Sequence, residues 1–136
     1  EPLFAEFDGL EPRDRLELLI EFSDTLPELS SPRCDVLPPR ECRVLECQTA
    51  VDLWVDVDDG LVTVEALVPR KSPTIRGLVA LLIEGINGSH ATDVLAMPDD
   101  VLEPLGLGET LGMTRQRGAR GLVAAIKRRT RAAQSA

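Results

Sequence analysis

The sequence predicts one α+β domain in which a small antiparallel sheet, made of a hairpin and a third strand, packs against helices. Three observations lead to this prediction. Apolar and polar residues alternate across residues 51–68, segments with helical apolar spacing flank that stretch, and 43% of the 136 residues are hydrophobic. That content is enough for one core without covalent staples. Residues 1–136 are therefore expected to form a single domain.

The first predicted helix spans residues 12–23. Pro12 suits the first turn of a helix. Residues at helical spacing follow it, namely Leu16, Leu19, Ile20 and Ser23. The next stretch, residues 25–39, contains four prolines. Proline disfavours helix interiors and central strands, so this stretch is predicted to be an extended surface loop.

Residues 51–68 predict a β-hairpin. Polar and apolar residues alternate with a period of two, which indicates strands with one buried face. Asp59 and Gly60 supply the turn. The apolar positions on the predicted buried face are Val51, Leu53, Val55, Val57, Val62, Val64, Ala66 and Val68.

The clearest helix spans residues 75–86, where apolar residues recur at offsets 3, 4, 7, 8 and 11 from Ile75. Ser72 is expected to cap its start, Pro73 suits its first turn, and Asn87 and Gly88 end it. This helix is expected to lie across the apolar face of the hairpin. Two short helical pieces follow near residues 92–96 and 99–105, and a basic final helix is predicted over residues 117–131.

The charge distribution favours a protein partner. The net charge of −8 makes nucleic acid an unexpected partner, because phosphate binding depends on cations. Residues 1–65 hold 17 acidic against 5 basic side chains, a balance of −12, whereas residues 66–136 hold 6 against 10, a balance of +4. Such a dipolar surface can steer an oppositely patterned protein.

No membrane association and a cytoplasmic location are expected. No stretch approaches the roughly 20 apolar residues that cross a bilayer, and the acidic start of the chain differs from a signal peptide. The chain has three cysteines, and an odd number argues against a secreted disulfide framework.

Cys47 is the candidate reactive residue. It stands where the proline-rich loop meets the first strand, in VLECQTAVDLWVDV. A thiol on a projecting loop can enter the active site of another protein, and its thiolate could take the outer sulfur of a persulfide held there. A persulfide benefits from apolar shelter, for which Trp54, Leu53 and the helix of residues 75–86 are candidate walls.

The surroundings of Cys47 in the sequence are mixed in charge. Glu41 and Glu46 oppose a thiolate, whereas Arg40 and Arg43 favour it, so the local charges roughly cancel. We therefore expect the groups of a partner to complete the activation of the thiol.

The other two cysteines are expected to be incidental, and two alternatives are open for them. Cys42, which precedes Cys47 in the same segment, could resolve an oxidised Cys47. A zinc site formed by Cys34, Cys42 and Cys47 is the other alternative, although their spacing lacks the short knuckles of structural zinc sites.

The chain resembles the SufE family of sulfur acceptors (SufE/CsdE). The most specific match is Cys47, Gln48 and Thr49 ahead of an apolar strand containing Trp54. Weaker matches follow the family's order along the chain: LPEL at residues 26–29, SPTIRGL at residues 72–78, DVL at residues 93–95, LGL at residues 105–107, and the basic final helix.

The resemblance implies a SufE/IscU-like fold and a sulfurtransferase-like carrier that acts only with a partner. It implies that Cys47 carries the persulfide, supported by Gln48, and that Arg115 matches a family arginine. Glu46 stands where the family often has glycine, and residues 112–114 replace a Ser-Pro pair before Arg115. The implied partners are a SufS-like cysteine desulfurase, which holds pyridoxal phosphate, and a SufB-type scaffold. No cofactor is implied on this chain.

Two further alternatives stay open at this point. The chain could be a docking module that regulates a desulfurase without carrying sulfur. It could also form a weak homodimer, since the sequence does not determine the oligomeric state.

Overall fold

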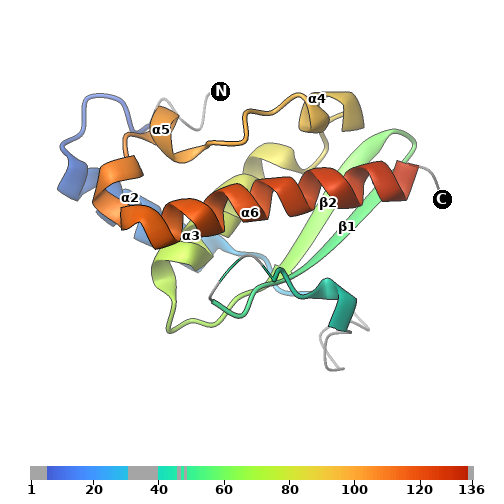
Figure 1. The fold of residues 1–136 in the computed structure, drawn as a ribbon, viewed down its shortest axis with the longest axis horizontal. Coiled ribbons are helices and arrows are strands. Elements are labelled where there is room, and N and C mark those ends of the chain that lie inside the picture. Colours follow the sequence, from blue (N-terminus) through green and yellow to red (C-terminus); the bar gives the residue numbers. More distant parts are fainter. Residues whose placement is uncertain (1–5, 31–39, 46, 48, 135–136) are drawn as a thin grey trace.

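The computed structural model describes residues 6–30, 40–45, 47 and 49–134. The elements in chain order are α2 (Pro12–Phe22), η1 (Ser23–Thr25), η3 (Arg40–Cys42), β1 (Asp52–Asp58), β2 (Leu61–Leu67), α3 (Pro73–Ile86), α4 (Ala91–Leu95), α5 (Leu102–Leu105) and α6 (Gly108–Gln134). Figure 1 shows α6 running along the molecule in front of α3 and the hairpin. The fold is α+β, with an antiparallel hairpin packed against helices, as predicted.

The hairpin forms where the alternating pattern predicted it. Asp59 and Gly60 both adopt positive φ angles, 58° and 79°, which is the geometry of a two-residue turn that matches strand twist. Val55 lies opposite Val64 in the register. The third strand expected from the sequence is not found in the described part of the chain, where the sheet has these two strands. The flanking segments meet the hairpin at single residues instead, in the isolated bridges of Arg43 with Asp52 and Leu61 with His90.

One strand residue departs from the predicted alternation. Asp52 was expected to face solvent, but its exposed fraction is only 4%. The Nε of Arg43 lies 3.2 Å from Oδ1 of Asp52, and this ion pair explains how the carboxylate is accommodated. The polar phase of the strand therefore breaks at the first residue of β1, where the preceding loop returns to the sheet.

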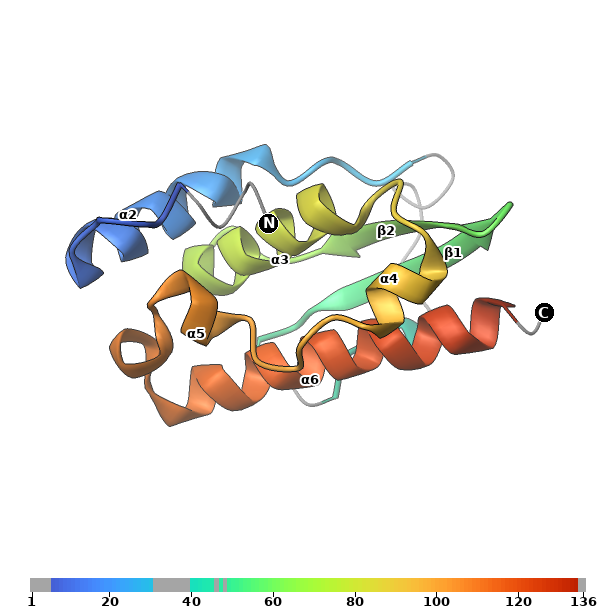
Figure 2. The ribbon, with the colours of Figure 1, turned by 90° about the horizontal axis from the view of Figure 1, so that it is seen from above.

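The core centres on α3, of whose 14 residues ten are buried. Figure 2 shows α3 between α2 and α6, with the hairpin beside it. Gly77 permits the close approach of α2, because a Cβ at this position would lie 2.0 Å from the carbonyl oxygen of Leu19. The adjacent Arg76 donates hydrogen bonds to the carbonyls of Ser23 at 2.8 Å and Val68 at 2.6 Å. Arg76 and Gly77 thus join α3 to the α2–η1 segment and to the end of the hairpin.

The start of α3 lies where the sequence predicted it, but the predicted side-chain cap is not formed. Ser72 is the N-cap residue and Pro73 begins the helix, yet the Ser72 side chain makes no capping hydrogen bond. Instead the Ser72 backbone N–H donates to the carbonyl of Pro69 at 3.1 Å, forming a turn that leads into the helix. The pKa of Arg76 is lowered mainly by burial and secondly by Arg70.

The final helix is longer than predicted and is kinked. α6 spans Gly108–Gln134, and Gly112 interrupts it with φ 81° and ψ 168°. This conformation is accessible essentially to glycine alone, so Gly112 separates a first turn from the long helix that follows. None of the helices in the described residues is long and apolar enough to cross a bilayer.

Candidate functional site

A pocket of about 470 Å³ lies beside Cys47. The loop before β1 contributes Cys47 and Thr49, and α3 contributes Ile75. The remaining lining comes from α6, namely residues 111–115 and Gly118. The structure therefore brings together Cys47 and Arg115, two of the residues that the sequence analysis selected.

Cys47 lies on a short loop that is closed at its base. The N–H of Val44 donates to the carbonyl of Val51 at 2.9 Å, and the N–H of Cys47 donates to the carbonyl of Val44 at 3.4 Å. Cys47 is half-buried, whereas the side chain of Leu45, two residues earlier, is 87% exposed. Cys47 thus lies on the loop that precedes β1, close to an apolar side chain that is presented to solvent.

The sulfur of Cys47 faces the helix α6. A Cβ placed on Gly118 would lie 3.5 Å from the Cys47 Sγ, an ordinary contact distance. Because Gly118 has no side chain, the α6 wall of the pocket leaves space directly at the sulfur of Cys47. Glycine inside a helix costs about 1 kcal/mol relative to alanine, and its presence is consistent with a need for space here.

The start of the long part of α6 contributes a basic side chain to the pocket. Met113, Thr114 and Arg115 directly follow the kink at Gly112, and all three line the pocket. Backbone N–H groups in a first helical turn carry positive partial charge, and the guanidinium of Arg115 adds a full charge. Arg115 therefore adds a positive charge to the lining of the pocket that also contains Cys47.

Trp54 and Cys42, two further residues of the predicted site, lie away from the pocket. Trp54 is half-buried in β1 opposite Glu65, and it is not among the described residues that line the pocket. Cys42 ends η3 with an exposed fraction of 8% and does not line the pocket either. Glu46 and Gln48 lie outside the described residues, as does Cys34. Of the predicted walls, α3 contributes through Ile75.

The cysteines and the lone histidine show no metal arrangement in the described part of the chain. Cys42 and Cys47 are thiols rather than disulfide partners. No group of three or more His, Cys, Asp or Glu side chains among the described residues could hold a metal ion. His90 is exposed at the start of α4.

The sequence analysis missed several residues that shape the site. Gly112 forms the kink in α6, and Gly118 leaves space beside the Cys47 sulfur. Met113, which is 71% exposed, extends the apolar surface beside the pocket. The available signal was two glycines inside a region of helical character, since an isolated glycine in a helix often marks a close approach.

Comparisons with known proteins agree with this fold. Residues 1–130 match the family model described as the SufE, Fe-S metabolism associated domain. A SufE-like protein of Mycobacterium tuberculosis, described as uncharacterized, is 38% identical over 132 residues, which cover 96% of this chain and 87% of that protein.

Two further similarities differ in the share of the matched protein that they cover. The chloroplastic quinolinate synthase of Nicotiana tabacum is 29% identical over 134 residues, but the match covers only 18% of that protein. The solution structure of a hypothetical protein from Thermus thermophilus matches with a TM-score of 0.81 and 27% identity, covering 99% of this chain and 98% of that one. On the strength of the family model and the 38% identical relative, the chain belongs to the SufE family of Fe–S metabolism associated domains.

Proposed function

We propose that this protein is a sulfur carrier that receives persulfide sulfur on Cys47 from a SufS-type cysteine desulfurase in the cytoplasm. It then delivers the sulfur to a SufB-type scaffold for iron–sulfur cluster assembly, and its uptake of sulfur stimulates the desulfurase. The observation that carries the proposal is the pocket itself, in which the Sγ of Cys47 faces Gly118 of α6 and Arg115 contributes to the lining.

The transfer conserves atoms and electrons. The Cys47 thiol first loses its proton to solvent or to a partner group, and the thiolate attacks the outer sulfur of the desulfurase persulfide. A new sulfur–sulfur bond forms on Cys47 while the donor's sulfur–sulfur bond breaks. The donor thiolate leaves with the electron pair and is protonated. No net oxidation occurs, so this chain requires no cofactor, and the pyridoxal phosphate belongs to the desulfurase.

The surroundings of Cys47 suit both the reaction and its product. Arg115 and the first turn after Gly112 would stabilise the attacking thiolate and the persulfide anion that follows. Ile75 and Leu111 give the pocket apolar sides, which would shelter the persulfide from reductants and oxidants. Because Cys47 is only half-buried, its sulfur would remain accessible to a partner protein.

Mass spectrometry after incubation with a SufS-type desulfurase and cysteine tests the proposal. The wild-type chain should gain one sulfur atom on Cys47, and the Cys47→Ser variant should gain none. Cys42→Ser is the matched control and should load like the wild type, because Cys42 does not line the pocket. A wild-type chain that binds the desulfurase and stays unmodified would instead support a docking module.

Desulfurase turnover gives a second readout. A carrier should stimulate cysteine desulfuration through Cys47, so Cys47→Ser should abolish the stimulation while leaving binding intact. Equal stimulation by both chains would contradict the proposal. Transfer onward is measured by adding a SufB-type scaffold to the loaded chain and following loss of the extra sulfur from Cys47.

A further inference from the structure

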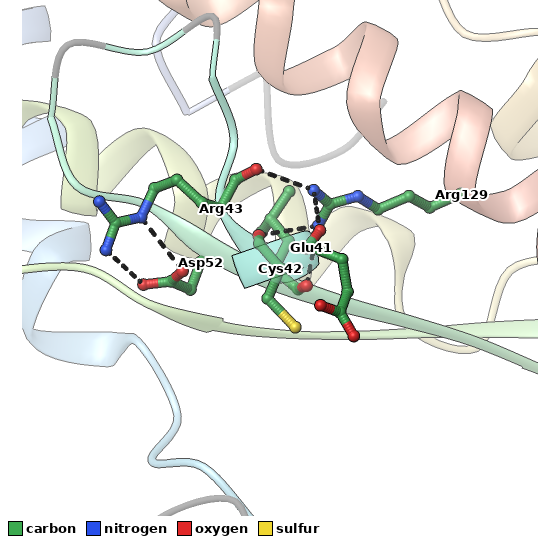
Figure 3. A network of polar contacts seen from close by, with 6 residues as sticks. Glu41, Cys42, Arg43, Asp52 and Arg129 are labelled. Atoms are coloured by element: carbon green, nitrogen blue, oxygen red, sulfur yellow. Dashed lines mark hydrogen bonds and ion pairs between the residues drawn. The ribbon is translucent and has the colours of Figure 1, made fainter. Parts of the chain in front are cut away.

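Arg129, near the end of α6, makes an unusual set of hydrogen bonds. Its Nη1 donates to the carbonyl of Leu53 at 2.8 Å and to that of Cys42 at 3.0 Å. Its Nη2 donates to the carbonyl of Glu41 at 3.1 Å and to that of Arg43 at 3.2 Å. Figure 3 shows the guanidinium reaching from the helix to the backbone of η3. One side chain thus bonds four carbonyl groups in two separate segments.

These two segments are the two legs of the loop that carries Cys47. Residues 41–43 lead into the loop and Leu53 follows it, so Arg129 bonds the chain on both sides of the loop. Between the legs, the ion pair of Arg43 with Asp52 at 3.2 Å closes the loop base. Figure 3 shows this ion pair on the opposite side of the backbone from Arg129.

The same helix that holds the loop base also forms the wall that the thiol faces. Gly118 lies against the Cys47 sulfur, and Arg129 follows eleven residues later on the continuous part of α6. Eleven residues of α-helix span about 16 Å. Since the helix is stiff over this length, fixing the loop base at Arg129 also fixes the position of Cys47 relative to its pocket.

We propose that Arg129 is a positioning residue for sulfur transfer, which fixes the base of the Cys47 loop to α6 and so holds the thiol at the pocket. This inference rests on the proposed function. Arg129 does not line the pocket, so it acts through the loop rather than on the sulfur. Loop tip residues such as the exposed Leu45 remain available to a partner while the base stays in place.

The chemistry of arginine suits this role. Its guanidinium carries five N–H donors in a fixed planar fork, so it can bond several carbonyls at once. A lysine would keep the charge but presents its donors from a single nitrogen, and it could not reproduce four bonds to two segments. Arg129→Lys therefore removes the four-bond arrangement and keeps the positive charge. This variant separates the effect of the hydrogen bonds from that of the charge.

The test compares Arg129→Lys with Arg120→Lys. Arg120 is an exposed residue of the same helix with one ion pair, to Asp100 at 3.4 Å, which a lysine can retain. Saturation kinetics of Cys47 persulfide loading from a SufS-type desulfurase give kcat and KM for each variant. Hydrogen exchange compares peptides covering residues 40–53 with peptides of α3, and iodoacetamide labelling reports the intrinsic reactivity of Cys47.

Arg129→Lys should lower the loading kcat about tenfold and leave KM within about twofold, because misplacing a reacting group by about 1 Å can cost about a hundredfold and a smaller displacement is expected here. Exchange should rise in residues 40–53 and stay unchanged in α3. Labelling by iodoacetamide should be unchanged or faster. Arg120→Lys should match the wild type in all three measurements.

Several outcomes would overturn the inference. They are an unchanged kcat for Arg129→Lys, unchanged exchange of residues 40–53, or an equal effect of Arg120→Lys. If Arg129→Lys does not fold, Asp52→Asn replaces it, because this variant weakens the loop base from the other side and should lower kcat in the same direction. A wild-type chain that gains no sulfur overturns the proposed function instead, and the exchange measurement, which needs no desulfurase, still decides whether Arg129 fixes the loop.

Discussion

Gly118→Ala should make the protein more stable and a poorer sulfur acceptor. Alanine in a helix interior is favoured over glycine by about 1 kcal/mol. For a domain of this size that gain corresponds to a rise in Tm of about 3–5 °C. The added methyl group would lie 3.5 Å from the Cys47 Sγ, where the persulfide needs room for a second sulfur about 2 Å further out.

The expected loss of transfer follows from the cost of crowding. Filling a packed site with one extra methyl group costs about 1–3 kcal/mol. Because 3.5 Å is an ordinary contact and the pocket is partly open, we expect the lower end, or about a fivefold slower loading of Cys47. Gly118→Val, which adds two more methyl groups, should load more slowly still.

The assay is the rate of persulfide loading, followed by mass spectrometry, together with thermal unfolding of each variant. Gly108→Ala is the matched control, since a Cβ at Gly108 meets nothing within 4 Å and lies away from the thiol. A Gly118→Ala variant that has a raised Tm and loads at the wild-type rate would refute this prediction, because the space at Gly118 would then be irrelevant to the persulfide.

Three further predictions concern stability. Gly77→Ala should lower the free energy of unfolding by about 3 kcal/mol or more in urea titrations, because its Cβ would lie 2.0 Å from the carbonyl oxygen of Leu19, and backbone must shift; a loss below about 1 kcal/mol would show that α2 and α3 separate easily. Leu122→Ala removes a fully buried side chain and should cost about 2–5 kcal/mol in the same titration, whereas a near-neutral result would contradict its place in the core. The hydrogen bond and charge of Lys127 lower the pKa of Asp99, so this pair should add a small stability that is present above the unfolded pKa and lost as pH falls through the folded pKa. NMR titration of the Asp99 carboxyl should show its pKa rise towards the ordinary value in Lys127→Met and at high salt, and an unchanged pKa would refute the pairing.

Elements with a strong local pattern were predicted well. The turn at Asp59 and Gly60, both strands, α3 with its proline start, and the short helices α4 and α5 all follow from period, turn residues and breakers that act within a few residues. The start of α6 was predicted at residue 117, whereas the helix begins at Gly108. Residues 108–116 contain two glycines and one buried apolar side chain, that of Leu111, and they therefore give little helical signal.

Positions whose environment comes from distant segments were predicted poorly. Asp52 has the polarity of an outward strand residue, yet Arg43 and the loop base enclose it. Trp54 was a predicted wall for Cys47, but the described wall comes from Ile75 and α6. Arg129 was one cation of a basic final helix in the sequence, whereas its partners are carbonyls 76 to 88 residues away.

By itself the sequence determined the α+β elements, the loop position of Cys47 and the family resemblance, because these depend on residue types close together in the chain. Only the tertiary structure decided that Cys47 faces Gly118 in a pocket that Arg115 also lines, and that Arg129 bonds the segments on both sides of the Cys47 loop. The physical reason is that such contacts arise when separate segments pack against one another, and the local pattern of one segment carries no information about which partner it will meet.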